Sequence, residues 1–318
     1  MNTRRLPALL AAGALALLGL SACSTADTPS SSGASGEAAA SGSAPSGDAG
    51  VTVVASTNVW GDIAQTIGGD AVTVTSIISD PDKDPHEYQA DARTQLALSK
   101  ADVVIENGGG YDDFVDTMLS ASDNASADVI NAVDVSGFAA TAGDELNEHV
   151  WYDYGTVSKV VDRIAQALSA ADPANASTFA ANAAAFAKGL DDLDASVATV
   201  KQAHEGARVA ITEPVPLYLL ENMGLDNVTP EAFSEAIEEE TDVAPAVLKE
   251  TTDLFADHAV SALVYNEQTS GPQSDAVLTA AKDAGVPVVP VQETLPQGIT
   301  YLSWQSGIID QISQALGD

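Results

Sequence analysis

The sequence predicts an α/β protein made of two lobes, each with a mainly parallel sheet, that are joined by one long helix. Short apolar strands alternate with helical segments in two separate runs, over residues 51–133 and 208–316. Such alternation is typical of parallel sheets covered by helices. Between the runs lies the longest helical pattern in the chain, from about Asp172 to Gln202, which corresponds to roughly 40–45 Å of helix. A helix longer than one small lobe suggests a strut that crosses between two lobes.

The start of the chain is predicted to be a signal peptide over residues 1–22. Arg4 and Arg5 give a basic start, and the apolar run that follows is too short to span a bilayer comfortably. The run ends in Leu-Ser-Ala-Cys, which is similar to a bacterial lipobox, so Cys23 is predicted to become the lipidated N-terminus. A secretory peptide with a chance cysteine is the alternative. Residues 23–50, rich in Ser, Gly, Ala and Pro, are predicted to form a flexible tether.

Composition excludes several classes of protein. Cys23 is the only cysteine, which excludes a disulfide within the chain and a cysteine-based zinc site. The chain has 46 acidic against 12 basic residues and a formal net charge of −34. Nucleic-acid binding requires a basic surface and is therefore excluded. An acidic surface attracts cations weakly, although acidity that serves solubility explains most of these charges.

Both lobes are predicted to alternate strands with helices. The N-terminal lobe, residues 51–172, has strands at 51–55, 72–78, 102–105 and 129–133, and helices at 59–67, 92–99, 111–120 and 155–169. The linking helix covers 173–204. The C-terminal lobe, residues 205–318, has strands at 208–212, 260–265 and 286–291, and helices at 215–223, 243–256, 274–284 and 301–316; no element is assigned to the acidic segment 231–242. Ligands of such sheets bind beyond the carboxyl ends of the strands.

Two of the four histidines are candidate ligands. His86 lies in a turn after a strand, where Pro85 stiffens the chain and Asp80, Asp82 and Asp84 are expected only to shape the turn. A surface histidine in a polar loop is the alternative. His149 lies beside Trp151 between a loop and a helix, and the alternative there is a buried histidine that bonds to backbone. His204 and His258 are expected to be structural or solvated, because one ends the long helix and the other precedes a strand.

Two acids follow strands of the C-terminal lobe directly. Glu213 comes after the strand 208–212, and Glu293 comes after the strand 286–291. The alternative is that they cap the following helices, a task that Glu performs poorly. Glu267 also follows a strand and is a reserve candidate, as a ligand or in support of one.

The sequence contains no pattern that indicates an enzyme. It lacks H-E-x-x-H, G-x-S-x-G and a P-loop, so we predict that the protein is not a catalyst. Two alternatives stay open. Histidines and carboxylates around a metal with an open coordination position would suit an extracellular metallohydrolase. A two-lobed binding protein for a chelated metal or siderophore would share the architecture without needing His86 and His149 to converge.

Four segments together resemble a known family, the metal-binding substrate-binding proteins of bacterial ABC importers (cluster A-I, TroA-like), which take up zinc and manganese. The resemblance covers roughly residues 51–318. Its first segment, Asp84-Pro85-His86-Glu87-Tyr88, resembles the D-P-H-x-Y motif that supplies the first histidine ligand. The second, Glu148-His149-Val150-Trp151, is a looser match to D-P-H-x-W, because Asn147 and Glu148 replace Asp and Pro.

The other two segments of the resemblance lie in the C-terminal lobe. Glu213 stands five residues before Tyr218, as does the His or Glu ligand of family members. Glu293-Thr294-Leu295 before Tyr301 resembles the last segment, where an acid, commonly Asp, closes the site. The resemblance therefore implies one divalent transition-metal ion as cargo in the cleft, held by His86, His149, Glu213 and Glu293.

The resemblance also implies partners and a location. The expected partners are an ABC permease and its ATPase, and the protein is expected to be a monomer on the outer face of the cell membrane, anchored by lipidated Cys23. The oxygen-rich ligand set with Glu213 favours Mn²⁺ as the cargo. The general order of metal affinities favours Zn²⁺, so zinc stays a candidate. Neutral imidazole is needed for binding, so affinity is predicted to fall as the pH drops below roughly 6.5.

Overall fold

The computed structural model describes residues 50–80, 86, 88–139 and 146–317. The predicted signal peptide, Cys23 and the tether up to residue 49 lie outside the described residues, as do Asp82, Asp84 and Pro85 of the turn before the first histidine. None of the helices in the described part of the chain combines the length and the apolar character that crossing a membrane requires.

The N-terminal lobe has a four-stranded parallel sheet with the strand order β2-β1-β3-β4. Its strands are β1 (Val51–Thr57), β2 (Val72–Ile78), β3 (Val103–Glu106) and β4 (Asp128–Asn131). Its helices are α1 (Asn58–Gly68), α2 (Ala92–Leu98), α3 (Phe114–Ala121), α4 (Ala132–Ser136) and α5 (Tyr154–Ala171). The strand order reverses direction between β1 and β3, and ligands of open α/β sheets bind at such switch points.

The C-terminal lobe repeats this topology with the order β6-β5-β7-β8, again parallel. Its strands are β5 (Arg208–Ile211), β6 (Asp226–Asn227), β7 (Ala262–Asn266) and β8 (Val288–Val291). Its helices are α7 (Leu217–Asn222), α8 (Glu231–Glu238), α9 (Pro245–Ala256), α10 (Pro272–Asp283) and α11 (Tyr301–Leu316).

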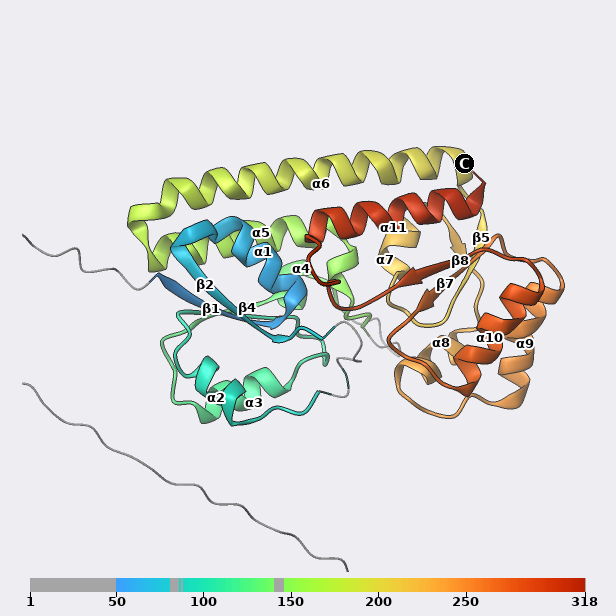
Figure 1. Cartoon of the computed structure of the whole chain (residues 1–318), viewed down its shortest axis with the longest axis horizontal. Coiled ribbons are helices and arrows are strands. Elements are labelled where there is room, and N and C mark those ends of the chain that lie inside the picture. The colour runs from blue at the N-terminus through green and yellow to red at the C-terminus, as the bar shows by residue number, and fades with distance from the viewer. Residues whose placement is uncertain (1–49, 81–85, 87, 140–145, 318) are drawn as a thin grey trace, which may run out of the picture. The chain divides into compact units, whose positions relative to one another are not determined.

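Helix α6 (Ala176–His204) joins the lobes. It follows a 3-10 turn over Pro173–Asn175, where the Asp172 side chain accepts a hydrogen bond from the Ala174 N–H. Its 29 residues span about 44 Å. The helix packs against α1 and α5 of the N-terminal lobe and against α7 and α11 of the C-terminal lobe, and it runs along both lobes in Figure 1. The predicted two-lobed α/β architecture with one long helix is confirmed.

Alternate residues of the strands face different cores, as the two-residue repeat of a strand requires. Val53 of β1 and Val209 of β5 belong to one continuous core, which we call the central core and which also contains the buried side of α6. Their neighbours point the other way: Val54 packs in a core with residues of α2 and α3, and Ala210 in a core with residues of α8, α9 and α10. One core therefore extends through both lobes.

Three elements differ from the sequence prediction, and one of them is the two-residue strand β6, where no strand is expected. Val133, predicted to end the fourth strand, lies in α4, because the Asn131 side chain accepts a hydrogen bond from the Asp134 N–H and caps a helix at that point. The acidic segment 231–242, where the sequence predicts no element, begins with helix α8. Phe233 and Ile237, four residues apart, are buried and give this helix an apolar stripe beside its acids.

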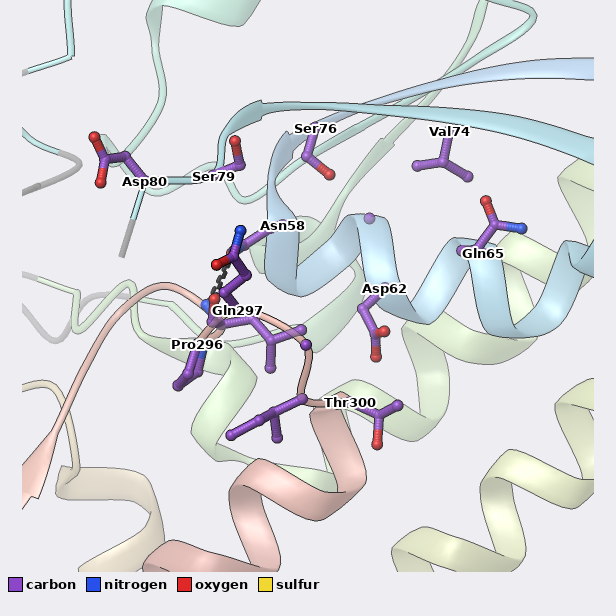
Figure 2. Close-up of a pocket in the computed structure, with 14 residues that line it drawn as sticks. Asn58, Asp62, Gln65, Val74, Ser76, Ser79, Asp80, Pro296, Gln297 and Thr300 are labelled. Carbon is purple, nitrogen blue, oxygen red and sulfur yellow. Dashed lines mark hydrogen bonds between the residues drawn. The ribbon is translucent and has the colours of Figure 1, made fainter. Parts of the chain in front are cut away.

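Hydrogen bonds from α1 tie the N-terminal lobe to the segment before α11. The Asn58 side chain donates to the Leu295 C=O and accepts from the Leu295 N–H, both at 2.8 Å. The Asp62 carboxylate accepts from the Tyr301 N–H at 2.8 Å. Asn58, Asp62 and Leu295 line a cavity of about 710 Å³, in which Asn58 and Asp62 face the segment that contains Pro296 and Thr300 (Figure 2).

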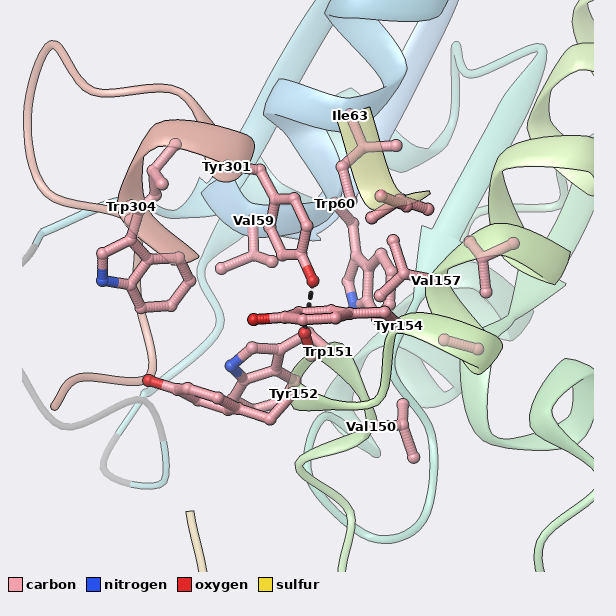
Figure 3. Close-up of a cluster of buried hydrophobic side chains, with 14 of the residues drawn as sticks. Val59, Trp60, Ile63, Val150, Trp151, Tyr152, Tyr154, Val157, Tyr301 and Trp304 are labelled. Atoms are coloured by element: carbon pink, nitrogen blue, oxygen red, sulfur yellow. Dashed lines mark hydrogen bonds between the residues drawn. The ribbon is translucent and has the colours of Figure 1, made fainter. Parts of the chain in front are cut away.

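Tyrosine hydroxyls make further bonds across the junction. They join the segment around Trp151 to the C-terminal lobe, within the aromatic cluster of Figure 3. The bonds run from Tyr301 Oη to the Trp151 C=O (2.6 Å), from Tyr152 Oη to the Gln292 C=O (2.8 Å) and from Tyr154 Oη to Gln305 Oε1 (3.0 Å). Both ends of the segment that follows His149 are thereby fixed against the second lobe.

Replacement of Asn58 tests the junction. Asn58→Ala removes two hydrogen bonds from the partly buried Leu295 backbone, so the free energy of unfolding in urea is expected to fall by about 1–3 kcal/mol. Gln65→Ala on the same helix is the control, since Gln65 is exposed and its side chain, within the described part of the chain, bonds only to the nearby Gly69 C=O; its effect is expected to stay within about 0.5 kcal/mol. Equal effects of the two substitutions would contradict the assigned role of Asn58.

Candidate metal centre

Side chains from both lobes converge at the junction. Ligating atoms of His86 and His149, from the N-terminal lobe, and of Glu293, from the C-terminal lobe, all lie within 4.8 Å of one another. We call these three residues the inner cluster. His86 follows β2, His149 follows α4 and begins a 3-10 turn, and Glu293 follows β8.

Strand geometry places the polar side chains of the C-terminal lobe. Glu213, Asn266 and Glu293 each lie two residues beyond a strand residue of the central core, namely Ile211, Val264 and Val291. A two-residue step returns a side chain to the same face of a sheet. The three side chains are accordingly buried, with 2%, 1% and 1% of their surface exposed.

His149 is held for ligation through one ring nitrogen. Its Nδ1 lies 2.8 Å from Asn147 Oδ1, which also accepts the His149 N–H, while the Asn147 amide nitrogen donates to the Pro214 C=O of the other lobe. Because Oδ1 can only accept, Nδ1 carries a proton and Nε2 faces the cluster. Nε2 is fully buried and has no hydrogen-bond partner among the described residues. A buried ring nitrogen of this kind fits a metal ligand once it has lost its proton.

His86 approaches the same point from the other side. Its Nε2 lies 3.5 Å from Glu293 Oε2, and its ring packs edge to face on Tyr111 with centroids 4.9 Å apart. A quarter of its side chain is exposed, whereas His149 and Glu293 are buried. His86 is therefore the member of the inner cluster that faces outward.

Glu293 is positioned by three neighbours. Oε2 accepts from Tyr111 Oη at 3.1 Å, and Oε1 accepts from Asn266 Nδ2 at 2.9 Å. Its backbone N–H donates to Gln268 Oε1 at 2.5 Å. One carboxylate oxygen thus faces the N-terminal lobe and the other faces β7, so Glu293 links the lobes.

Glu213 lies beside the inner cluster but is not a member of it. Its Oε2 accepts a hydrogen bond from Asn266 Nδ2, the same nitrogen that donates to Glu293. Asn266 is therefore a neutral bridge between two buried carboxylates, whose mutual repulsion it reduces. Neither group of potential ligating atoms within 4.8 Å of one another contains Glu213.

Glu238 is a site residue that the sequence analysis did not identify. Its Oε1 lies 3.3 Å from Nε2 of both His86 and His149, and it also forms a group with His86 and Glu148 whose ligating atoms lie within 4.8 Å of one another. A signal was present, because Glu238 lies four residues after the buried Ser234 and so shares its helix face. The sequence could not tell that this face of α8 meets the junction.

The remaining candidates lie outside the cluster. Glu267 is exposed, and its backbone N–H donates to the Val291 C=O, while its neighbour Asn266 points into the site. His258 is exposed in a turn with φ of 49°. His204 is half-buried at the end of α6. None of these three belongs to a potential metal-binding group among the described residues.

The charges at the site depend on one another. Burial favours neutral imidazole, but contacts with Glu238 and Glu293 outweigh it and raise the pKa of His86 to about 11 and that of His149 to about 9. The two imidazoles in turn hold the pKa of Glu293 well below its usual range despite burial. Burial, together with the charges of Glu238 and Glu293, raises the pKa of Glu213 well above its ordinary value.

The arrangement suits a divalent cation. Among the described residues, no Lys or Arg makes an ion pair with the carboxylates of the site, so only protons on the imidazoles balance their charge. A divalent ion can replace those protons and accept both imidazole nitrogens and the carboxylate oxygens as ligands.

The sequence matches one protein family over most of its length. Residues 53–315 match a family described as the zinc-uptake complex component A, periplasmic. The manganese-binding lipoprotein MntA of Halalkalibacterium halodurans is 29% identical over 221 residues, 64% of this chain and 72% of that protein. The metal ABC transporter substrate-binding lipoprotein FimA of Streptococcus parasanguinis is 27% identical over 331 residues, 98% of this chain and 99% of that protein.

Solved structures share the fold. The periplasmic zinc-binding protein TroA from Treponema pallidum superimposes with a TM-score of 0.71 at 21% identity, covering 85% of this chain and all of that one. The matches fit a substrate-binding component of a metal ABC transporter, not the hydrolase or siderophore alternatives, and the prediction that the protein is not an enzyme is confirmed. The chain therefore belongs to the family of zinc-uptake complex component A, as its four ligand-like segments predict.

Proposed function

We propose that this protein captures one Mn²⁺ or Zn²⁺ ion outside the cytoplasm and delivers it to the permease of an ABC transporter. The ligands are His86, His149, Glu213 and Glu293. One observation carries the proposal. Two imidazole nitrogens and a buried carboxylate from the two lobes lie within 4.8 Å of one another, and His149 Nε2 has no hydrogen-bond partner among the described residues.

Manganese is the favoured cargo. The carboxylates of Glu213 and Glu293 give an oxygen-rich set, and Glu238 lies close enough to add a third. Oxygen ligands suit Mn²⁺, whereas Zn²⁺ prefers four ligands rich in nitrogen or sulfur. Zinc stays the second candidate, since two imidazoles also suit it and its intrinsic affinity is higher.

The position of the protein in the cell follows from its leader. In this proposal residues 1–22 are removed, Cys23 is lipidated, and residues 23–50 tether a monomeric pair of lobes to the outer face of the membrane. The lobes are residues 51–172 and 205–318, and residues 173–204 link them. The relatives MntA and FimA are named as lipoproteins, which supports the anchor.

Substitution of the ligands tests the site. Loss of an outer-shell partner alone costs about 10–100-fold in metal affinity, so His149→Ala and Glu293→Ala are each expected to weaken Mn²⁺ or Zn²⁺ binding at least about 100-fold. His86→Ala and Glu213→Ala are expected to weaken it as well. Calorimetry and native mass spectrometry measure the affinity and the metal content.

His204→Ala is the matched control for these substitutions. His204 belongs to neither potential metal-binding group among the described residues, so its removal is expected to leave the affinity within about twofold. Circular dichroism checks that each variant is folded. Wild-type affinity in a folded His86→Ala or His149→Ala variant would refute the proposed site.

Metal binding is expected to release protons over a wide pH range. Both imidazoles have a raised pKa, about 11 for His86 and about 9 for His149, and must lose their protons to bind metal. Below pH 9, affinity is expected to fall by up to about 100-fold for each pH unit, because up to two protons compete with one ion. The nearby carboxylates thus raise the pH below which metal affinity falls; for an isolated imidazole this pH is expected to be roughly 6.5. Calorimetry in buffers of different ionisation enthalpy counts the protons, and a flat affinity from pH 8 to pH 5 would contradict histidine ligation.

The same shifts predict how stability depends on pH when metal has been removed. A histidine with a raised pKa stabilises the folded protein, and this contribution is complete at a pH below 6.5, the ordinary pKa of histidine. The contribution is lost as the pH rises through the pKa values in the folded protein, about 9 for His149 and about 11 for His86. The melting temperature of chelator-treated protein is therefore expected to fall between pH 7 and pH 10. The His86→Ala/His149→Ala variant is the comparison, and an equally steep fall in that variant would contradict this origin.

Substitution of Cys23 tests the anchor. Cys23→Ser is expected to move the exported protein from the membrane fraction to the soluble fraction, because the lipid is lost while the folded lobes are unchanged. Metal affinity of the purified variant is the control and is expected to equal that of the wild type. A Cys23→Ser protein that still sediments with the membrane would contradict lipidation at this residue.

A further inference from the structure

An acidic cavity reaches the metal centre from one side. It has a volume of about 840 Å³ and lies between the segment 146–148, helix α7 and helix α8. Its described lining includes seven acids, among them Glu148 and Glu238, and no Lys or Arg. Such a cavity concentrates cations and disfavours anions. Acidity alone defines no site, so the side chains at the inner end of the cavity decide whether a cation binds there.

The cavity touches the metal centre at its outward side only. His86 lines it, whereas His149, Glu213 and Glu293 do not. These three are also almost fully buried, with at most 2% exposed. A cation that arrives through the cavity therefore meets His86 before it can meet the other ligands.

At this point His86 has a second set of partners. Ligating atoms of His86, Glu148 and Glu238 lie within 4.8 Å of one another. Glu238 Oε1 is inaccessible to solvent and makes no well-formed hydrogen bond among the described residues, although it lies 3.3 Å from His86 Nε2. One imidazole and two carboxylates form a set of ligands that suits Mn²⁺.

Hydrogen bonds hold the backbone of Glu148 in this set. The Glu148 C=O accepts hydrogen bonds from Asn107 Nδ2 at 2.9 Å and from the Val150 N–H at 2.7 Å. Asn107 is fully buried. The backbone of Glu148 is thus held next to His149. The Glu148 carboxylate belongs to the group with His86 and Glu238, whereas the ring of its neighbour His149 belongs to the inner cluster.

We propose that His86, Glu148 and Glu238 form an outer metal position, where Mn²⁺ is captured before it moves into the inner cluster. This inference rests on the proposed function of the inner cluster. His86 is common to both groups, and its Nε2 lies 3.3 Å from Glu238 Oε1 and 3.5 Å from Glu293 Oε2; since one nitrogen binds one ion, an ion occupies one position or the other. Glu238 Oε1 lies 3.3 Å from both imidazoles and stays in reach during the move. The ion exchanges Glu148 for His149 and Glu293.

The kinetics of binding test the outer position. Glu148 contacts the ion on its way but not in the inner cluster, so Glu148→Gln is expected to slow association and dissociation of Mn²⁺ by a similar factor, about tenfold. Kd then changes much less than either rate. Trp151, whose ring lies 5.1 Å from that of His149, provides a fluorescence signal for stopped-flow measurement.

Glu239→Gln is the matched control. Glu239 lines the same cavity but belongs to neither group, and its substitution removes the same charge. It is expected to change the rates less than about twofold. Equal slowing by both substitutions would show a general effect of charge and overturn the outer position, as would unchanged rates in Glu148→Gln.

Blocking the inner cluster tests the position directly. In the variant His149→Ala/Glu293→Gln, Mn²⁺ is expected to bind weakly with one coordinated histidine nitrogen, counted by electron spin-echo spectroscopy, against two in the wild type. Addition of Glu148→Gln is expected to abolish this binding, and circular dichroism confirms the fold of each variant. No Mn²⁺ in the folded blocked variant, while the wild type shows two nitrogens, overturns only the outer position. No Mn²⁺ or Zn²⁺ in the wild type overturns the proposed function and, with it, this inference.

Discussion

The burial of carboxylates between the two lobes is the constraint on which the rest of the structure depends. Glu213 and Glu293 are almost fully buried, and a buried charge needs a partner. The partners in the described residues are neutral donors, Asn266, Thr269 and Tyr111, and two imidazoles that need a proton to carry charge. A permanent cation such as Lys would balance the acids but would also repel a metal ion. The site therefore keeps its negative charge available for a cation that can leave.

The shared core and the hydrogen bonds between the lobes hold these side chains close together. The central core runs through both lobes and along α6, and side-chain hydrogen bonds from Asn58, Tyr152 and Asn147 cross the junction. Wide separation of the lobes would break these bonds and expose apolar surface. Access through a side cavity avoids this cost, because an ion reaches His86 without movement of the central core.

Much of the site could be predicted from the sequence, because strand ends are local features. Glu213 and Glu293 each come two residues after the end of an apolar strand, and the structure buries both at the junction. Glu267 was named by the same logic, but β7 ends at Asn266, and the two-residue repeat that carries Ala262 and Val264 inward carries Asn266 rather than Glu267. Strict attention to this repeat would have found Asn266. Glu238 was out of reach, since its place depends on how α8 packs against the rest of the lobe.

The two carboxylates that sequence reasoning missed or left aside explain how one site can be both deep and accessible. A buried site with only His149 and Glu293 would hold an ion well but would present no ligand to an ion in solution. Glu148 and Glu238 present oxygens at the cavity, and His86 is common to both sets. Each step of the path then replaces one ligand by another instead of removing the ion from all of them at once. Since dehydration and loss of ligands dominate the barrier to moving a divalent ion, such stepwise exchange lowers it in both directions, toward binding and toward release.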